Sequence, residues 1–157
     1  MSTRLPFETY LETVRHAPLV AIDLIVEGAD GLFLLGLRKK NPASGSWFVL
    51  GGRIYKDESL DHAFARISHD ELGVELARGD ARFLGVDEHF YDENAGGLPG
   101  FGTHYVVLGY CIKCDRSSLA LPEDQHSDYR WFQRDELLQD SQVHPNTRRY
   151  FEAFEPV

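Results

Sequence analysis

Runs of basic residues are scarce in this chain of 157 residues, and acidic residues outnumber basic ones. The longest run of Lys and Arg is Arg38-Lys39-Lys40, and the formal net charge is −9. Because an acidic chain repels nucleic acid unless a basic patch overrides its charge, we expect no nucleic-acid partner. A metal cation, or a nucleotide that carries one, suits this charge better.

Long apolar runs are also missing. No stretch approaches about 18 apolar residues, the length that a membrane-spanning helix needs. Arg4, Glu8 and Glu12 interrupt the N-terminal segment too early for a signal peptide. The sequence therefore predicts no membrane partner.

Cysteine is rare, with only Cys111 and Cys114 in the chain. Two cysteines provide no disulfide framework, so we expect a reducing compartment and a cytoplasmic location. Their spacing is C-x-x-C, but in redox proteins that motif opens a helix. Here it lies in the apolar run 104–114, which is typical of a strand. This position favours two unrelated structural thiols.

Length and composition indicate one globular domain spanning residues 1–157. Hydrophobic residues make up 43% of the chain and charged residues 26%, which is ordinary for a soluble domain. The length allows one substantial core and not comfortably two. We find no repeat, no low-complexity tract and no linker long enough to separate domains.

The expected secondary structure mixes strands and helices without regular alternation. Strands are expected at 19–27, 32–37, 47–50, 82–91, 104–114 and 129–132, and helical segments at 6–16, 60–72, 135–140 and 144–154. A polar loop is expected at 121–128 and a glycine-rich loop at 92–102. The helix at 60–72 is the clearest, because Ser59 can cap its start and Gly73 can close its end. The pattern predicts an α+β fold, a mixed sheet with helices packed on it.

The segment 51–74 carries the most chemistry. It contains a double glycine expected to turn the chain, two arginines and a carboxylate pair: Gly51, Gly52, Arg53, Arg66, Asp70 and Glu71. Cleavage next to a diphosphate requires a divalent cation and guanidinium groups that take up negative charge. Mg²⁺ is satisfied by one or two carboxylates together with substrate oxygens. The segment therefore predicts a metal-assisted diphosphate site.

Residues 52–74 resemble the Nudix box, G-x5-E-x7-R-E-U-x-E-E-x-G-U, in which U is aliphatic. Six positions match the pattern: Gly52, Glu58, Arg66, Glu71, Gly73 and Val74. Ile67 stands where the box has Glu, Asp70 replaces the first Glu of the pair, and Ser68 is a milder mismatch. The resemblance implies a Nudix fold, a single domain in which helices sandwich a mixed sheet.

The substitution at Ile67 removes a ligand that could hold a second or third cation. Fewer cations activate water less strongly next to phosphorus, so the site is either inert or attacks a different atom. In a nucleotide sugar, attack on the anomeric carbon expels the whole nucleoside diphosphate. One cation and several arginines can stabilise that leaving group, and the water then needs only a general base.

The rest of the chain resembles the GDP-mannose mannosyl hydrolase branch of the Nudix superfamily, which has the same altered box. The segments that carry the resemblance are PLVAIDLIVE, LLGLRKKNPASGSWFVLGGRIYKDE, HFYDEN, THYVVLGY, LPEDQHSDYRWF and VHPNTRRYF. Leu50 departs from the branch, in which a proline usually precedes the double glycine. The resemblance implies hydrolysis of GDP-mannose, or GDP-glucose, to GDP and free sugar with inversion at the anomeric carbon. It also implies a homodimer with a swapped or interfacial N-terminal helix.

The resemblance implies one Mg²⁺ per active site, which Mn²⁺ can replace. Its ligands would be Glu71, the main-chain carbonyl of Gly51 and the side chain of Gln125, although Gln125 alone would suggest a loop-capping amide. His126 would be the general base, since an unperturbed pKa of about 6.5 lets it accept a proton at neutral pH. A histidine in a loop is otherwise more often a surface residue.

Three arginines, Arg38, Arg53 and Arg66, are expected to bind the diphosphate and stabilise GDP as it departs. Arg66 could instead pair with Asp70 one helical turn away. Asp23 interrupts an apolar strand, so it needs a partner such as Arg38 or a sugar hydroxyl. The resemblance assigns it to positioning of the sugar or of an arginine.

Substrate contacts are expected from the strands beside the glycine-rich loop. His89 and Tyr105 would touch the diphosphate or the sugar, or else only pack the strands. Phe7 and Tyr91 are candidates for stacking on the guanine. The role of Glu58 stays open between catalysis and helix capping.

Two other functions fit the same residues. One is a conventional nucleoside-diphosphate-sugar pyrophosphatase, which attacks phosphorus and releases a sugar phosphate. The other is an inert Nudix-like module that binds a nucleotide, which Ile67 and Asp70 would favour. Glu71, Gln125 and His126 argue against the inert module, because a pure binder has little reason to keep them together.

Overall fold

Strand β1, Leu19–Glu27, forms the centre of the sheet because it is apolar and rich in β-branched residues. The computed structural model describes residues 4–123 and 126–153. Along its whole length β1 pairs in parallel with β6, Thr103–Lys113, and its middle pairs antiparallel with β4, Leu50–Arg53. Strand β5, Arg82–Tyr91, pairs antiparallel with β6 and ends this half of the sheet.

The other half of the sheet is built on β2, Phe33–Arg38. It pairs antiparallel with β3, Trp47–Phe48, and with β7, His126–Phe132. Strand β1 meets β2 only at the hairpin end, where Glu27 is opposite Phe33. The chain then passes from one half to the other between β3 and β4. Residues from both halves can therefore converge where β4 begins.

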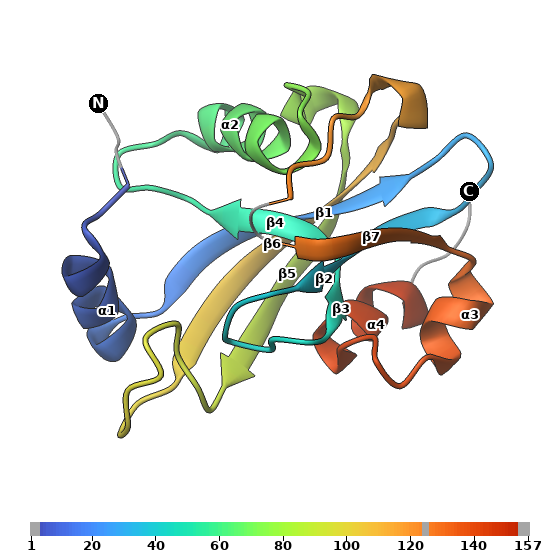
Figure 1. The fold of residues 1–157 in the computed structure, drawn as a ribbon. Coiled ribbons are helices and arrows are strands. Elements are labelled where there is room, and N and C mark those ends of the chain that lie inside the picture. The colour runs from blue at the N-terminus through green and yellow to red at the C-terminus, as the bar shows by residue number, and fades with distance from the viewer. Residues whose placement is uncertain (1–3, 124–125, 154–157) are drawn as a thin grey trace.

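Helices cover both faces of the sheet (Figure 1). Helix α2, Leu60–Leu72, lies on one face, and helices α3, Arg134–Gln139, and α4, Pro145–Glu152, lie on the other. Helix α1, Phe7–His16, lies at one end beside the loop 92–102. Two short 3₁₀ helices, Arg78–Asp80 and Arg116–Ser118, complete the described elements. No helix among the described residues is long and apolar enough to span a bilayer.

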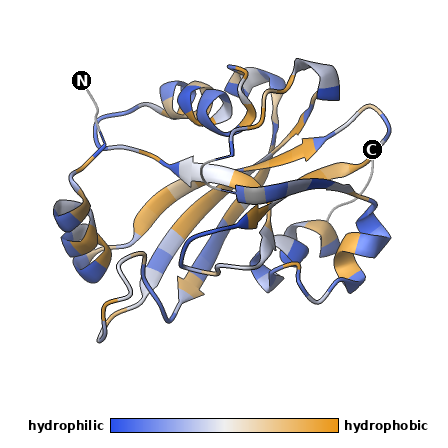
Figure 2. Cartoon of the chain, viewed as in Figure 1, coloured by the Kyte–Doolittle hydropathy of each residue, from blue (hydrophilic) through white to orange (hydrophobic). Residues whose placement is uncertain are grey.

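Alternate residues of β1 pack into two separate hydrophobic cores. Ile22, Leu24 and Val26 pack with residues of α2, whereas Ile25 packs with residues of α3 and α4. Hydrophobic residues gather in the central strands, as Figure 2 shows. Because side chains alternate along a strand, Asp23 shares the face of Ile25 and points toward α4. The position of this acid is therefore set by the strand period.

Several sequence predictions are confirmed. Helix α2 has the predicted bounds, the Ser59 side chain accepts a hydrogen bond from the backbone of His62 (3.1 Å), and Gly73 ends the helix at φ 73°. Strands β1 and β5 also have the predicted bounds. Both cysteines are free thiols, with Cys111 buried in β6 and Cys114 just beyond it.

The prediction that Gly51 and Gly52 turn the chain is wrong. Both lie inside β4, opposite Asp23 and Ile22 of β1. Glycine is needed there for close packing, because a Cβ at Gly51 would lie 2.4 Å from the carbonyl oxygen of Ile22. The predicted strand 47–50 is in fact divided between β3 and β4.

The predicted loop 121–128 is wrong at its end. Strand β7 begins at His126, where the prediction began the strand at Tyr129. A bulge between Leu37 and Arg38 of β2 allows Arg38 to pair with His126. The last helix is shorter than predicted. It begins at Pro145, because His144 is its cap, and it ends at Glu152.

Candidate active site

Glu71 and His126 come together between α2 and the β2–β7 pair. Nε2 of His126 lies 3.7 Å from Oε2 of Glu71, and both side chains are at least nine-tenths buried. The imidazole packs against Gly36 of β2, where a Cβ would lie 2.5 Å from Nδ1 of His126. The glycine in β2 therefore makes room for the ring beside the carboxylate.

The altered positions of the box have different environments. Ile67 is 1% exposed and belongs to the core under α2. The Asp70 side chain is 53% exposed and lies 3.5 Å from the Arg66 guanidinium. Glu71, in contrast, is 4% exposed. Of the residues at these three positions, only Glu71 offers a buried carboxylate.

The donor set fits one divalent cation that takes further ligands from a substrate. The Ile67 side chain lies 3.3 Å from where a Cβ of Gly52 would be, so this part of α2 packs over β4, which also carries the predicted ligand Gly51. No three His, Cys, Asp or Glu residues gather as a metal cage in the described part of the chain. Gln125, the third predicted ligand, lies outside the described residues. Glu71 and the Gly51 carbonyl are hard oxygen donors, as Mg²⁺ prefers.

Arg66 is engaged inside the protein. Its Nε lies 2.7 Å from Oε2 of Glu58, and its Nη2 donates to the carbonyl of Arg53 (2.7 Å). The Glu58 carboxylate is fully covered and also accepts the backbone N–H of Tyr55 (3.0 Å). The Arg66 guanidinium holds the pKa of Glu58 below its usual range. Glu58 therefore ties the loop before α2 to the helix, and a diphosphate contact by Arg66 stays a prediction.

Asp23 has a partner that the sequence did not indicate. The hydroxyl of Tyr150 in α4 donates to Oδ2 of Asp23 (2.8 Å), and the Tyr150 ring packs on Gly109 of β6. Burial raises the pKa of Asp23 to about 7, while the Tyr150 hydrogen bond and the Arg38 charge oppose this shift. The carboxyl is therefore poised to change its protonation near neutral pH.

At the α1 end, Tyr10 and Arg53 come together with a predicted substrate residue. The Arg53 guanidinium lies 4.2 Å from the centre of the Tyr10 ring, a cation–π contact. Tyr10 also interacts with the hydroxyl of Tyr105, whose pKa is raised mainly by burial. Phe7, one turn earlier, is 55% exposed and lies 6.2 Å from the Tyr10 ring. The helix thus presents Tyr10 to this group, and stacking by Phe7 stays a prediction.

Near α4, Arg38 borders a group of aromatic rings. Its guanidinium lies 5.3 Å from the Phe48 ring centre, and Phe48 stacks on His144 at 4.6 Å. The Tyr91 ring lies 5.6 Å from His144 and 6.2 Å from Tyr105. The rings therefore connect the two ends of the site along one face of the sheet.

His89 faces the same side from β5. It is buried, and its Nε2 lies 3.2 Å from Oδ2 of Asp87. Burial lowers the pKa of His89, so the neutral ring is favoured at pH 7. A hollow of about 490 Å³ lies beside this group, between β5 and α4, and is lined by residues 82–87 and by Arg149, Tyr150 and Ala153. Neither residue of the Glu71–His126 pair lines this hollow.

Sequence reasoning missed Tyr10, Tyr150 and His144. Tyr10 falls three residues after Phe7, so helical spacing could have pointed to it. Tyr150 is 127 residues from Asp23, and only the need of a buried acid for a donor hinted at it. These groups supply an imidazole beside a buried carboxylate, arginine side chains and several aromatic rings. That set can hold an anionic, ring-containing substrate and move one proton.

Comparisons with known proteins identify the family. The NUDIX domain model matches residues 17–154. The "Low-salt glycan biosynthesis protein Agl8" of Haloferax volcanii is 34% identical over 155 residues, which cover 98% of this chain and 93% of that protein. The MutT NUDIX hydrolase of Burkholderia pseudomallei superposes with a TM-score of 0.70 at 26% identity, covering 89% of this chain and all of that one.

A more distant structure shows the same fold. The NUDIX domain of Shewanella oneidensis NrtR, solved with ADP ribose, superposes with a TM-score of 0.62 at 19% identity, covering 94% of this chain and 97% of that one. The match of the family model to most of the chain and the curated relative at 34% identity are independent findings. The chain therefore belongs to the NUDIX domain family and has the Nudix fold of its hydrolases.

Proposed function

We propose that this protein hydrolyses a nucleoside diphosphate sugar, GDP-mannose above all and GDP-glucose as a second substrate, to GDP and free hexose. Water attacks the anomeric carbon of the sugar with inversion. One divalent cation, Mg²⁺ or Mn²⁺, assists the departure of GDP.

The buried Glu71–His126 pair carries this proposal. An attack on phosphorus is favoured by several cations, which need several carboxylates on the helix. Here Ile67 is in the core and Asp70 points outward, so Glu71 is left with an imidazole 3.7 Å away. That arrangement suits a reaction that needs one cation for the leaving group and one base for the water.

The reaction proceeds by a single displacement. The water oxygen forms a bond to the anomeric carbon, the His126 imidazole accepts the water proton, and the bond from that carbon to the diphosphate oxygen breaks. The electron pair of that bond leaves with GDP. When bound by Glu71 and the Gly51 carbonyl, the cation supplies positive charge for the diphosphate.

Arginines and an acid position the substrate on either side of the broken bond. Arg38 and Arg53 would pair with the diphosphate; Arg38 ends β2 and Arg53 ends β4. The Asp23 carboxyl, which accepts from Tyr150, would accept from a sugar hydroxyl or stabilise positive charge on the sugar. The name of the archaeal relative, which refers to glycan biosynthesis, agrees with a sugar nucleotide as substrate.

Product analysis tests the proposal. Purified protein is incubated with GDP-mannose and Mg²⁺, and the products are separated by chromatography. The proposal predicts GDP and free mannose in equal amounts. GMP and mannose 1-phosphate would instead identify a conventional pyrophosphatase, and unchanged GDP-mannose would support an inert module. A homodimer and a cytoplasmic location remain predictions.

A further inference from the structure

His144 has a tautomer fixed by its own helix. Its Nδ1 accepts the backbone N–H of Asn146 (3.1 Å) and so caps α4. A neutral imidazole that accepts at Nδ1 carries its proton on Nε2. No residue in the described part of the chain hydrogen-bonds to Nε2. Burial lowers the pKa of His144 to about 4, so the ring is neutral at pH 7.

Asn146, two residues further, presents a second unused donor. The residue is 6% exposed, and its Nδ2 has no hydrogen-bond partner among the described residues. The Tyr91 hydroxyl is the nearest acceptor: burial raises the pKa of Tyr91 and a hydrogen bond from Asn146 opposes this rise, although its geometry is poor and leaves Nδ2 without a well-formed partner. A buried amide without a partner is uncommon and asks for an external acceptor.

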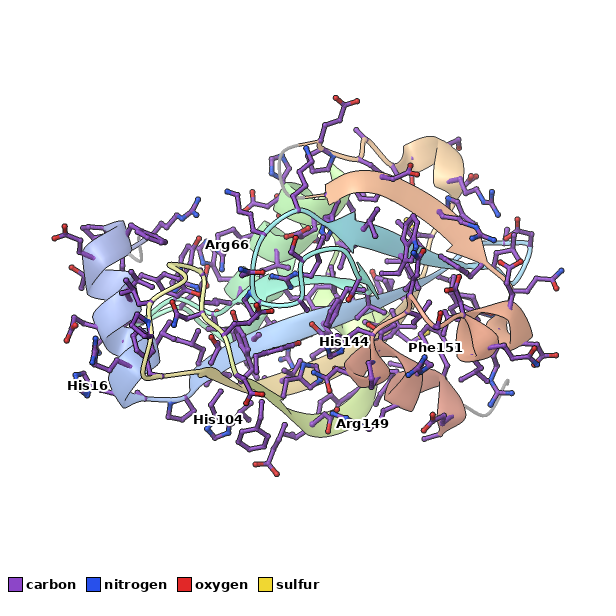
Figure 3. The ribbon with its side chains drawn as sticks, turned by 60° about the horizontal axis from the view of Figure 1, so that its bottom comes forward. His16, Arg66, His104, His144, Arg149 and Phe151 are labelled. Carbon is purple, nitrogen blue, oxygen red and sulfur yellow. The ribbon has the colours of Figure 1, made fainter. Side chains whose placement is uncertain are left out.

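Both donors lie at the α4 end of the candidate site. His144 stacks on Phe48, and its ring lies 5.6 Å from that of Tyr91. The Arg38 charge contributes to the lowered pKa of His144, after burial. Figure 3 places His144 near the middle of the molecule, where α4 meets the sheet, while Arg149 of the same helix points toward β5. Asp23, held by Tyr150 of α4, belongs to the same end.

The chemistry of this end suits a hexose better than a phosphate. His144 and Asn146 are neutral donors, Asp23 is an acceptor, and Tyr91 adds an aromatic ring beside them. Sugar rings offer hydroxyls that both donate and accept, and C–H faces that pack on aromatic rings. The cationic group with Tyr10 and Arg53 lies at the other end, toward α1, and Arg38 lies between them.

We propose that Nε2 of His144 and Nδ2 of Asn146 hydrogen-bond hexose hydroxyls of the bound nucleotide sugar and thereby determine sugar specificity. This inference rests on the proposed function for its substrate class. The two residues position the sugar and take no part in proton transfer. Their loss should therefore weaken binding of the sugar half of the substrate alone.

Calorimetric titration of variants tests this inference. A His126→Leu background keeps GDP-mannose intact, so the Kd values of GDP-mannose and GDP are measured separately in the presence of Mg²⁺. His144→Ser retains a side chain that caps α4 but removes the ring donor. Asn146→Ala removes the amide. Each change should weaken GDP-mannose binding about tenfold, the effect of one hydrogen bond, and leave GDP binding within about twofold.

Thr147→Val is the matched control. Thr147 lies in the same helical turn, and its hydroxyl accepts the backbone N–H of Val49 (3.2 Å), so it fixes α4 to the sheet without facing the sugar. The control should leave the ratio of the two Kd values unchanged. A changed ratio in this control, or equal weakening of GDP and GDP-mannose in the test variants, would show a structural role and overturn the inference.

Different results would contradict the proposed reaction and the proposed hexose contacts. If wild-type protein releases no mannose while both test variants still lose GDP-mannose affinity selectively, the proposed reaction fails and the hexose contacts stand. If mannose is released but the parent protein binds GDP-mannose no more tightly than GDP, or the variants retain its affinity, the hexose contacts are wrong.

Discussion

Ile67 occupies the position of a metal-binding Glu in the Nudix box. The box position that would carry a second metal-binding carboxylate carries a side chain buried under α2. Restoring Glu there would place a charge against the core, at a free-energy penalty of several kcal/mol. The difference from the Nudix box is therefore part of the packing of α2. The sequence predicted that a metal ligand is missing at this position, and the structure shows that Ile67 fills it as a core residue.

Replacement of His126 tests the base directly. His126→Leu keeps a side chain against Gly36 but removes the proton acceptor, so kcat should fall by about 10²- to 10⁴-fold. The Kd for GDP should change little, because GDP lacks the hexose whose anomeric carbon the water attacks. Steady-state kinetics and calorimetry measure the two quantities. His69→Leu, an exposed histidine on α2, is the control, and retained turnover in the His126 variant would contradict the assignment.

Asp23 should make stability depend on pH. The folded protein keeps the Asp23 proton up to about pH 7, whereas the unfolded chain releases it near pH 3.8. The folded state therefore binds more protons in this window, and the free energy of unfolding should decrease as pH rises from 4 to 7, by at most about 4 kcal/mol. Asp23→Asn should lose this decrease and be more stable at pH 8. Urea unfolding at several pH values measures the free energy of unfolding of both proteins. Equal pH profiles for the wild type and the variant would contradict the raised pKa of Asp23.

The sequence could locate Asp23 but not its partner. An acid inside an apolar run is visible in one short segment, whereas Tyr150 reaches it only through the packing of α4 on the sheet. Tyr10 differs, since its helical spacing from Phe7 was a usable signal, but its contact with Arg53 depends on how α1 packs. Partners far apart in the chain depend on how elements pack, which local patterns do not contain.

At the scale of elements, the sequence predicted the strands with continuous apolar runs well. Strand β7 was predicted three residues too short, because its first residues, His126 to Asp128, are polar and read as a loop. The pairing with β2 through a bulge, and not the local composition, makes them a strand. His126, the proposed general base, lies in the part that composition could not assign.

The packing of β2 against β7 predicts the effect of Gly36→Ala. The new Cβ would lie 2.5 Å from Nδ1 of His126, so the imidazole must shift from its position beside Glu71. We expect kcat to fall at least about tenfold, since misplaced catalytic groups lose that much or more. Gly79→Ala, where no atom lies within 4 Å of the added Cβ, should leave kcat unchanged. An unaffected Gly36 variant would show that the ring position is not critical.

The loop before α2 depends on Glu58. Replacing it with Gln keeps the shape but weakens two bonds to Arg66, so the free energy of unfolding should fall by about 2 kcal/mol at pH 7. Asp61→Asn, which alters the exposed pair with Arg78, should cost less than about 1 kcal/mol. Urea unfolding compares the variants. An equal loss in both would contradict the role of Glu58 as a buried anchor.

At the scale of the whole molecule, the fold was predictable and the assembly of the site was not. The fold follows from patterns within single elements and from the box that joins β4 to α2. The predicted site residues come from elements far apart in the chain: Glu71 of α2 lies beside His126 of β7, and Asp23 of β1 lies beside Tyr150 of α4. Residue types at the box suggested the chemistry, whereas these pairings depend on how the elements pack.

The position of bond cleavage is the central claim, and hydrolysis in water enriched with heavy oxygen measures it. GDP-mannose is hydrolysed in labelled water with Mg²⁺, and mass spectrometry locates the label in the products. Attack on the anomeric carbon places the heavy oxygen in mannose and leaves GDP unlabelled. Heavy oxygen in a phosphate group of the nucleotide, or of a sugar phosphate, would contradict the account.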